Sequence, residues 1–137
     1  MATRGFEELK VYQLEETLAD DVWHLVLKWP RLAQDTVGKQ LIRACDSIGA
    51  NIAEGTGKGT YADNRRYERV ARGSLCETRH WLRRAFRRGL LAPADTERLK
   101  PMVEELGPRL NAYLRSIGRQ PPVIQDPPSD SQMTNDK

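Results

Sequence analysis

The residues in this sequence that are best suited to chemistry are arginines, and they are concentrated in one short segment. Between positions 64 and 88 nine arginines are opposed by only two acidic residues, Glu68 and Glu77, so this segment carries a formal charge of +7. The whole chain has a net charge of +3, so the remaining residues must sum to −4. Guanidinium groups bind phosphate and carboxylate oxygens through paired hydrogen bonds. The segment therefore predicts an anionic partner.

Six of these arginines recur at helical spacing on one face, which we call the arginine stripe. They are Arg65, Arg69, Arg72, Arg79, Arg83 and Arg87. We expect them to contact the phosphates of RNA or DNA, which gives affinity with little sequence readout. Two alternatives stay open, namely docking of an acidic partner protein and a solvated face that only keeps the chain soluble. The opposite side of this helix is expected to face the core. Its residues are Tyr67, Val70, Ala71, Ser74, Thr78, Trp81 and Ala85.

The sequence offers little for catalysis or for metal binding. Segment 55–60 (GTGKGT) differs from a phosphate-binding loop, because Ile52 stands where a glycine is required and Gly59 where Ser or Thr is required. His24 and His80 are far apart in sequence, and no set of nucleophile, base and orienting residue can be assembled. We therefore expect a protein that is not an enzyme, with no catalytic residue, metal, cofactor or small-molecule substrate.

The elements that must position the arginine stripe are helices. Apolar residues recur at helical spacing almost throughout, and no stretch alternates as a strand does. The periodicity predicts helices at about 11–28, 35–54, 61–88 and 94–117. Short connections between long helices predict an all-α fold, an antiparallel up-down-up-down four-helix bundle formed by residues 1–119. The segment 120–137 is rich in Pro, Asp and Ser and is expected to be disordered.

Local signals predict where these helices begin and end. Trp29-Pro30 should end the first helix, because the residue before a proline avoids the helical region. Gly55 is expected to cap the second helix at its C-terminus. Thr60 and Asp63 resemble a capping box at the start of the third. Pro101 either bends the fourth helix or marks its true start.

The second predicted helix carries more apolar surface than a bundle core needs. Leu41, Cys45, Ile48 and Ile52 form one stripe that should face the core. A second apolar patch lies roughly 100° away on the helix. It consists of Ile42, Gly49 and Ala53. We expect this second patch to form an interface with other copies of the chain, so the protein is predicted to be a homo-oligomer.

A narrow polar ridge runs beside the core stripe of the same helix. With two residues of the third helix it forms a predicted structural polar ladder: Gln40, Arg43, Ser47, Asn51, Glu54, Ser74 and Glu77. An antiparallel pairing of the two helices places Arg43 near Glu77 and Ser47 near Ser74. It also places Glu54 near Arg66 or Tyr67. Because buried charges need partners, we interpret these residues as scaffold and not as an active site.

Length and composition set the broad class of protein. A chain of 137 residues and 15.6 kDa is the size of one domain. No apolar run approaches the roughly 18–20 residues of a membrane span. Cys45 and Cys76 are the only cysteines, so no disulfide framework is expected. We expect a cytoplasmic protein with no membrane contact.

Several short sequence blocks resemble one protein family. They are Phe6, residues 9–13 (LKVYQ), Gln40-Leu41, Arg43-Ala44, Ser47-Ile48, residues 51–55 (NIAEG), residues 71–75 (ARGSL) and Glu77. Together they resemble the bacterial four-helix-bundle proteins encoded in intervening sequences of large-subunit ribosomal RNA genes. The accessory variability proteins of diversity-generating retroelements are relatives of these proteins. The resemblance covers roughly residues 6–117.

The resemblance implies a four-helix bundle that assembles as a homopentameric barrel. Its retroelement branch implies binding to a reverse transcriptase and to nucleic acid through a basic surface, and its other branch implies a link to ribosomal RNA. The arginine stripe is not part of the matching blocks. Nucleic-acid binding by the stripe therefore follows from the arginines themselves and not from the family.

Overall fold

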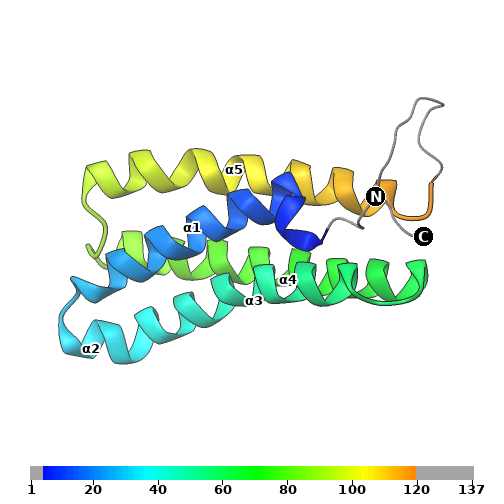
Figure 1. The fold of residues 1–137 in the computed structure, drawn as a ribbon. Coiled ribbons are helices and arrows are strands. Elements are labelled where there is room, and N and C mark those ends of the chain that lie inside the picture. The colour runs from blue at the N-terminus through cyan, green and yellow to red at the C-terminus, as the bar shows by residue number, and fades with distance from the viewer. Residues whose placement is uncertain (1–4, 120–137) are drawn as a thin grey trace.

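The computed structural model describes residues 5–119, and this part of the chain is helical with no strand. Four long helices make up most of it: α1 (Lys10–Leu27), α3 (Lys39–Thr56), α4 (Tyr61–Arg87) and α5 (Pro93–Ser116). Three short segments are η1 (Phe6–Glu8), α2 (Arg31–Ala33) and η2 (Gln34–Gly38). The four long helices lie side by side as a bundle, with their connections at alternate ends (Figure 1). The segment 120–137, for which we expected disorder, lies outside the described residues.

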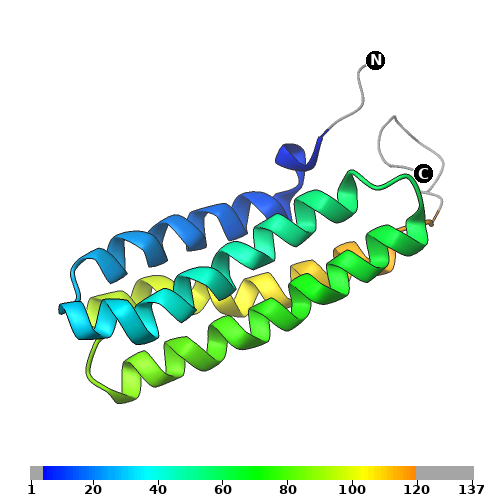
Figure 2. The same ribbon diagram turned by 90° about the horizontal axis from the view of Figure 1, so that it is seen from below.

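The core is formed by apolar side chains from all four long helices. The largest fully buried ones are Leu18, Leu41, Ile48, Ile52, Leu106 and Leu110. Burial of each such side chain stabilises the fold by roughly 1.5–3 kcal/mol. α3 packs on both α1 and α4, while α5 closes the bundle against the same two helices. Figure 2 shows α4 along one outer edge of the bundle.

The second predicted helix begins earlier and ends later than expected. The chain is helical from Arg31, through a turn of π-helix in η2, and α3 continues to Thr56. A Cβ on the buried Gly38 would lie 2.6 Å from Cγ1 of Val26, so a larger residue would push η2 off α1. α1 itself ends at Leu27, close to the predicted stop at Trp29-Pro30.

Gly55 is not a C-cap, which corrects the prediction. It is buried inside the last turn of α3, and a Cβ there would lie 2.6 Å from Oε2 of Glu68 and 2.8 Å from Cβ of Tyr67. The glycine thus allows α3 and α4 to approach closely, and its conformational freedom is not required.

The starts of α4 and α5 test two further predictions. The side chain of Thr60 accepts a hydrogen bond of 3.1 Å from the backbone N–H of Asp63, which confirms the predicted cap. α5 begins at Pro93 and includes Pro101 and Pro108, so a start at Pro101 is wrong. Both internal prolines are exposed, so water can reach the carbonyls that lose their helical donors.

The core face of α4 differs from the predicted one. Val70, predicted to face the core, is 48% exposed, whereas Glu68, which is absent from the predicted core face, has no exposed surface at all. The residues of α4 that are buried are Glu68, Ala71, Leu75, Thr78 and Ala85. The helix is therefore rotated relative to the prediction, and the N-terminal half of the arginine stripe lies beside α5.

Candidate nucleic-acid interface

The arginine stripe is held on one straight element. α4 runs for 27 residues without a proline, so the helical spacing of the arginines is kept from end to end. Arg65 is half-buried and the other five are exposed. All six predicted binding residues therefore share one face of α4, five of them open to solvent.

The stripe contrasts with the ion-paired arginines of the bundle. Arg31 pairs with Asp35 at 3.1 Å and Arg98 pairs with Asp95 at 3.3 Å. Within residues 5–119 none of the six stripe arginines forms an ion pair. The positive charge of the stripe is thus left for water, for ions or for a partner.

The first half of the stripe lies against the C-terminal half of α5. Nη1 of Arg65 donates a hydrogen bond of 3.2 Å to the carbonyl of Ile117, and Nη1 of Arg72 donates one of 3.2 Å to Oδ1 of Asn111. A hollow of about 450 Å³, which we call the arginine pocket, opens between the two helices. Its lining residues are Arg65, Arg69, Arg72, Leu114, Arg115, Ile117 and Arg119.

Sequence reasoning missed two residues of this pocket, Arg115 and Arg119. Arg115 lies in the last turn of α5, whereas Arg119 follows the end of the helix, beyond Gly118 with its φ of 82°. Helical spacing therefore does not relate the two residues. Only the packing of α5 and its C-terminal turn against α4 brings them to the stripe.

Glu68, one of the two acids counted against the nine arginines, does not act as a countercharge. Burial raises the pKa of its carboxyl to about 9, because no charged partner compensates for the loss of water. At neutral pH Glu68 is therefore protonated, and Glu77 is the remaining acid of segment 64–88. The charge of that segment rises from +7 to +8.

A partly buried polar network joins α3, α4 and α5. The hydroxyls of Thr56 and Tyr113 are 2.9 Å apart. The side-chain amide of Asn64 lies 3.2 Å from the Tyr113 hydroxyl, 3.2 Å from the Gly55 carbonyl and 2.7 Å from Oε2 of Glu68. With its nitrogen turned toward Gly55 and Glu68, Asn64 donates to both and accepts from Tyr113. These bonds fix the ends of α3 and α5 against α4, next to Arg65.

A second buried carboxyl lies between α1 and α3. Glu15 is buried, and its partner is Cys45, whose Sγ donates a hydrogen bond of 3.7 Å to Oε2. Burial, together with the nearby charge of Asp46, raises the pKa of Glu15 to about 8. The heptad-like spacing of Val11, Glu15 and Leu18 placed this acid on the buried stripe of α1, but sequence reasoning did not single it out.

Part of the predicted oligomer interface is covered by the chain itself. Gly49 is buried, and a Cβ at this position would clash with Oε1 of Glu15. The prediction that Gly49 faces another copy is therefore wrong, since α1 occupies that space. Ile42 and Ala53, the other two members of the patch, are half-buried.

The predicted polar ladder is present in its central part. The hydroxyls of Ser47 and Ser74 are 2.9 Å apart, which is the pair that the register predicts. Nδ2 of Asn51 donates to the carbonyl of Ser47 at 2.8 Å and to its hydroxyl at 3.0 Å. The pair of serines ties α3 to α4 near the middle of both helices, and Asn51 holds Ser47 from within α3. Gln40, at the start of the predicted ladder, is half-buried.

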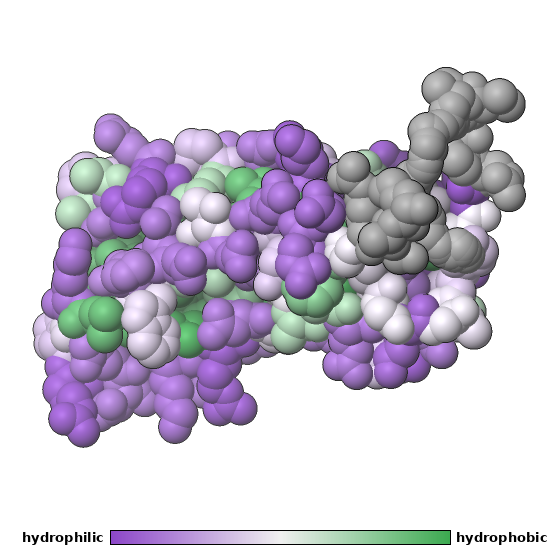
Figure 3. Space-filling view, viewed as in Figure 1, coloured by the Kyte–Doolittle hydropathy of each residue, from purple (hydrophilic) through white to green (hydrophobic). Residues whose placement is uncertain are grey.

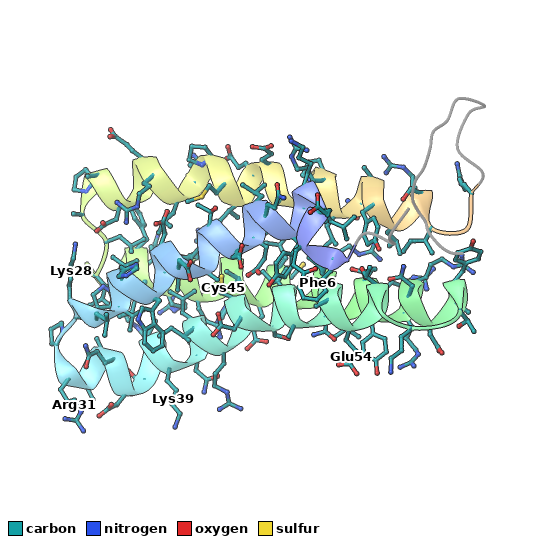
Figure 4. All side chains as sticks on the ribbon, in the orientation of Figure 1. Phe6, Lys28, Arg31, Lys39, Cys45 and Glu54 are labelled. Atoms are coloured by element: carbon teal, nitrogen blue, oxygen red, sulfur yellow. The ribbon has the colours of Figure 1, made fainter. Side chains whose placement is uncertain are left out.

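The charged ends of the ladder differ from the prediction. Arg43 and Glu77 are exposed and form no ion pair with each other. Oε2 of Glu77 instead accepts a hydrogen bond of 3.2 Å from Nε1 of Trp81. Glu54 pairs with Lys58 at 3.6 Å and not with Arg66. Figure 4 shows Glu54 pointing away from the bundle, whereas Cys45 lies between the helices.

Two features that would suggest other functions are lacking in residues 5–119. None of the helices in this range is long and apolar enough to cross a membrane. The same part of the chain holds no cluster of three or more His, Cys, Asp or Glu residues that could bind a metal ion.

Comparison with known proteins places this bundle in a family. The model of the family described as 23S rRNA-intervening sequence protein matches residues 7–112. This chain belongs to that family. Comparison with curated proteins gives no match.

A solved structure supports the fold of this family member. It is a protein of unknown function from the S23 ribosomal protein family of Bacteroides thetaiotaomicron VPI-5482, determined at 1.70 Å resolution. The two chains are 22% identical and superpose with a TM-score of 0.67, over 77% of this chain and 98% of the other. At this level of identity the likeness extends to the fold.

Proposed function

We propose that this protein is a non-enzymatic nucleic-acid-binding accessory protein that contacts phosphates through the arginine stripe. The observation that carries the proposal is the row of exposed arginines on α4 without acidic partners in residues 5–119. Repulsion along such a row costs free energy, and bound phosphates relieve it while releasing counterions. The protonation of buried Glu68 removes a negative charge from the core side of the same helix.

RNA is the first nucleic acid to test. Support comes from the family itself, whose description refers to intervening sequences of 23S rRNA. Phosphate contacts from one helix face give affinity with little discrimination between sequences. Specificity would then come from a partner, either ribosomal RNA structure or a reverse transcriptase to which the bundle is an accessory.

We further propose that the antiparallel up-down-up-down bundle works as a homopentamer. Large apolar side chains are exposed on α1 and α2, where Trp23 is 50%, Leu27 58% and Leu32 78% exposed. Figure 3 shows apolar side chains gathered at this end of the bundle, between α1 and the start of α3. Their burial between copies would favour association, and five stripes in one ring would multiply a weak contact through avidity.

Charge reversal within the stripe tests the proposed function. We expect the triple variant Arg72→Glu, Arg79→Glu, Arg83→Glu to lose RNA binding, measured by fluorescence anisotropy, with an unchanged helical circular dichroism signal. The matched control is Lys10→Glu, Lys28→Glu, Lys39→Glu, which changes the net charge equally at exposed lysines on other elements. Equal losses in both variants, or RNA binding that survives the stripe variant, would contradict the proposal. A wild-type protein that binds no RNA at low salt would favour an acidic partner protein instead.

The pentamer has its own test. Light scattering at micromolar concentration should give a mass near five times the 15.6 kDa of one chain. Replacing Trp23 and Leu27 by Asp should reduce that mass without loss of helix, whereas a wild-type monomer would contradict the assembly.

A further inference from the structure

The two halves of the arginine stripe offer an anion different surroundings. Arg79, Arg83 and Arg87 form a row on one helix. Arg65, Arg69 and Arg72 face a second row, Arg115 and Arg119, across the arginine pocket. Five guanidinium groups, from α4, from α5 and from the turn that follows α5, therefore surround one hollow, and of the described residues that line it none is acidic.

Such a density of charge exceeds what an internal phosphate of a nucleic acid can neutralise. A phosphodiester carries one negative charge, whereas a terminal phosphate carries about −1.5 to −2 at neutral pH. A terminal di- or triphosphate adds further charges within a few ångströms. The pocket thus matches a linear polyphosphate better than it matches a nucleic-acid backbone.

The guanidinium groups of the pocket are available to such a ligand. Arg65 and Arg72 each have one hydrogen bond to α5, which fixes their direction and leaves other N–H groups free to donate. Arg69, Arg115 and Arg119 form no ion pair with any carboxylate in residues 5–119. Multiple N–H donors on fixed planar groups suit the several oxygens of neighbouring phosphates.

The floor of the pocket favours an anion, and hydrogen bonds reduce the repulsion that its rim would exert. Leu114 and Ile117 are almost fully buried and form an apolar floor, which weakens screening by water. The C-terminus of α5 would repel an anion through its carbonyls. Three of these carbonyls already accept hydrogen bonds: Leu114 O from Ile117 N, Ser116 O from Arg119 N, and Ile117 O from Arg65 Nη1.

We propose that the arginine pocket binds a linear di- or triphosphate, carried by the 5′ end of an RNA or by a free nucleoside triphosphate. The 5′-end source rests on the proposed function, because it requires that RNA binds to the stripe. The stripe then holds internal phosphates along α4 while the pocket holds the chain end. This arrangement would direct the protein to the 5′ ends of unprocessed transcripts.

The test compares one short single-stranded RNA with a 5′-hydroxyl and the same RNA with a 5′-triphosphate, using anisotropy and the full chain. We expect about tenfold tighter binding of the triphosphate form, and a log affinity that falls more steeply with log salt by about two further contacts. Fluorescent GTP, added without RNA, tests the free nucleotide as the source.

Two pocket variants and one control locate the effect. Arg115→Ala with Arg119→Ala, and separately Arg69→Ala, should reduce the preference for the triphosphate to less than about twofold. All three residues are exposed, so both variants should fold. The control, Arg83→Ala with Arg87→Ala, should weaken both RNAs equally and keep the preference.

The outcomes separate this proposal from the proposed function. Equal affinity for the two RNAs, with no GTP binding, overturns the pocket proposal and leaves RNA binding by the stripe intact. A preference that survives both pocket variants also overturns it. Binding of GTP but of neither RNA, lost in the pocket variants, supports the free nucleotide as ligand and contradicts the proposed function.

Discussion

The N-terminal and C-terminal halves of α4 carry the same arginine spacing but differ in what lies around it. The N-terminal half packs beside the end of α5, so Arg65, Arg69 and Arg72 line a pocket. It also has a buried acid, Glu68, on its core side. The C-terminal half carries an open row of arginines in place of the pocket, and Thr78 on its core side in place of Glu68. The Thr78 hydroxyl donates a hydrogen bond of 2.9 Å to the Ser74 carbonyl of the same helix. A helix sets the spacing of its side chains, but its neighbours decide what that spacing can bind.

The largest expected effect concerns the buried acid of the N-terminal half. In the folded protein the pKa of Glu68 is about 9, above its ordinary value of 4.5, so the native state holds a proton that the unfolded chain releases. The contribution of Glu68 to the free energy of unfolding is therefore fully present below pH 4.5. It falls as pH rises toward 9, by about 1.4 kcal/mol per pH unit. Glu68→Gln should remove this dependence and stabilise the fold by up to about 3 kcal/mol at pH 7.

Urea unfolding between pH 6 and 9 measures this effect. The matched variant of the C-terminal half is Thr78→Val, which should leave the pH dependence unchanged. Glu15, with a pKa of about 8, adds a second slope of the same sign that persists in Glu68→Gln until that pH. A Glu68→Gln protein with the wild-type pH profile would mean that Glu68 is ionised in the folded state.

Charge reversal in the two halves should affect nucleic-acid binding unequally. With 5′-triphosphate RNA we expect Arg69→Glu with Arg72→Glu to weaken binding about 100-fold, and Arg83→Glu with Arg87→Glu about tenfold. The reason is that the first pair lines a pocket with an apolar floor, while the second pair is exposed to water, which screens its charge more strongly. Equal losses, measured by anisotropy at one salt concentration, would remove the distinction between the halves.

The smallest expected effects come from two single hydrogen bonds. Tyr113→Phe removes a buried hydroxyl that bonds Thr56 and Asn64, and should cost about 1–2 kcal/mol in the free energy of unfolding. Trp81→Phe removes the exposed bond to Glu77 and should cost less than about 0.5 kcal/mol. Chemical denaturation of both variants gives the two losses in the free energy of unfolding. Similar losses would show that the polar network joining α3, α4 and α5 adds no special stability.

The sequence predicted those parts of the molecule that depend on local pattern. Helical periodicity placed the four long helices, the Thr60 cap was correct, and the register of α3 and α4 predicted the bond between Ser47 and Ser74. The predicted Gly55 cap was wrong, because a glycine at a helix end and a glycine at a close helix contact look alike in sequence. A helix end and a close helix contact both favour a residue that has no side chain.

The sequence did not predict the features that depend on neighbouring elements. A glutamate beside arginines is normally solvent-facing, so the burial of Glu68 was missed, and with it the rotation that exposes Val70. The arginine pocket required Arg115 and Arg119 to face α4, which is a matter of how α5 packs. The charges counted along the chain therefore predicted the arginine stripe, but they did not predict that half of it lines a pocket.

The central claim is that the unpaired arginines of α4 bind nucleic-acid phosphates, and a salt titration of RNA binding tests it most directly. Anisotropy with a 5′-hydroxyl single-stranded RNA should show log affinity falling linearly with log salt, with a slope of about −0.7 for each phosphate contact and so about −4 for the six arginines of the stripe. The same titration with Arg72→Glu, Arg79→Glu, Arg83→Glu should show no measurable binding. Absence of binding by the wild-type protein at low salt, or an affinity that does not change with salt, would contradict the claim.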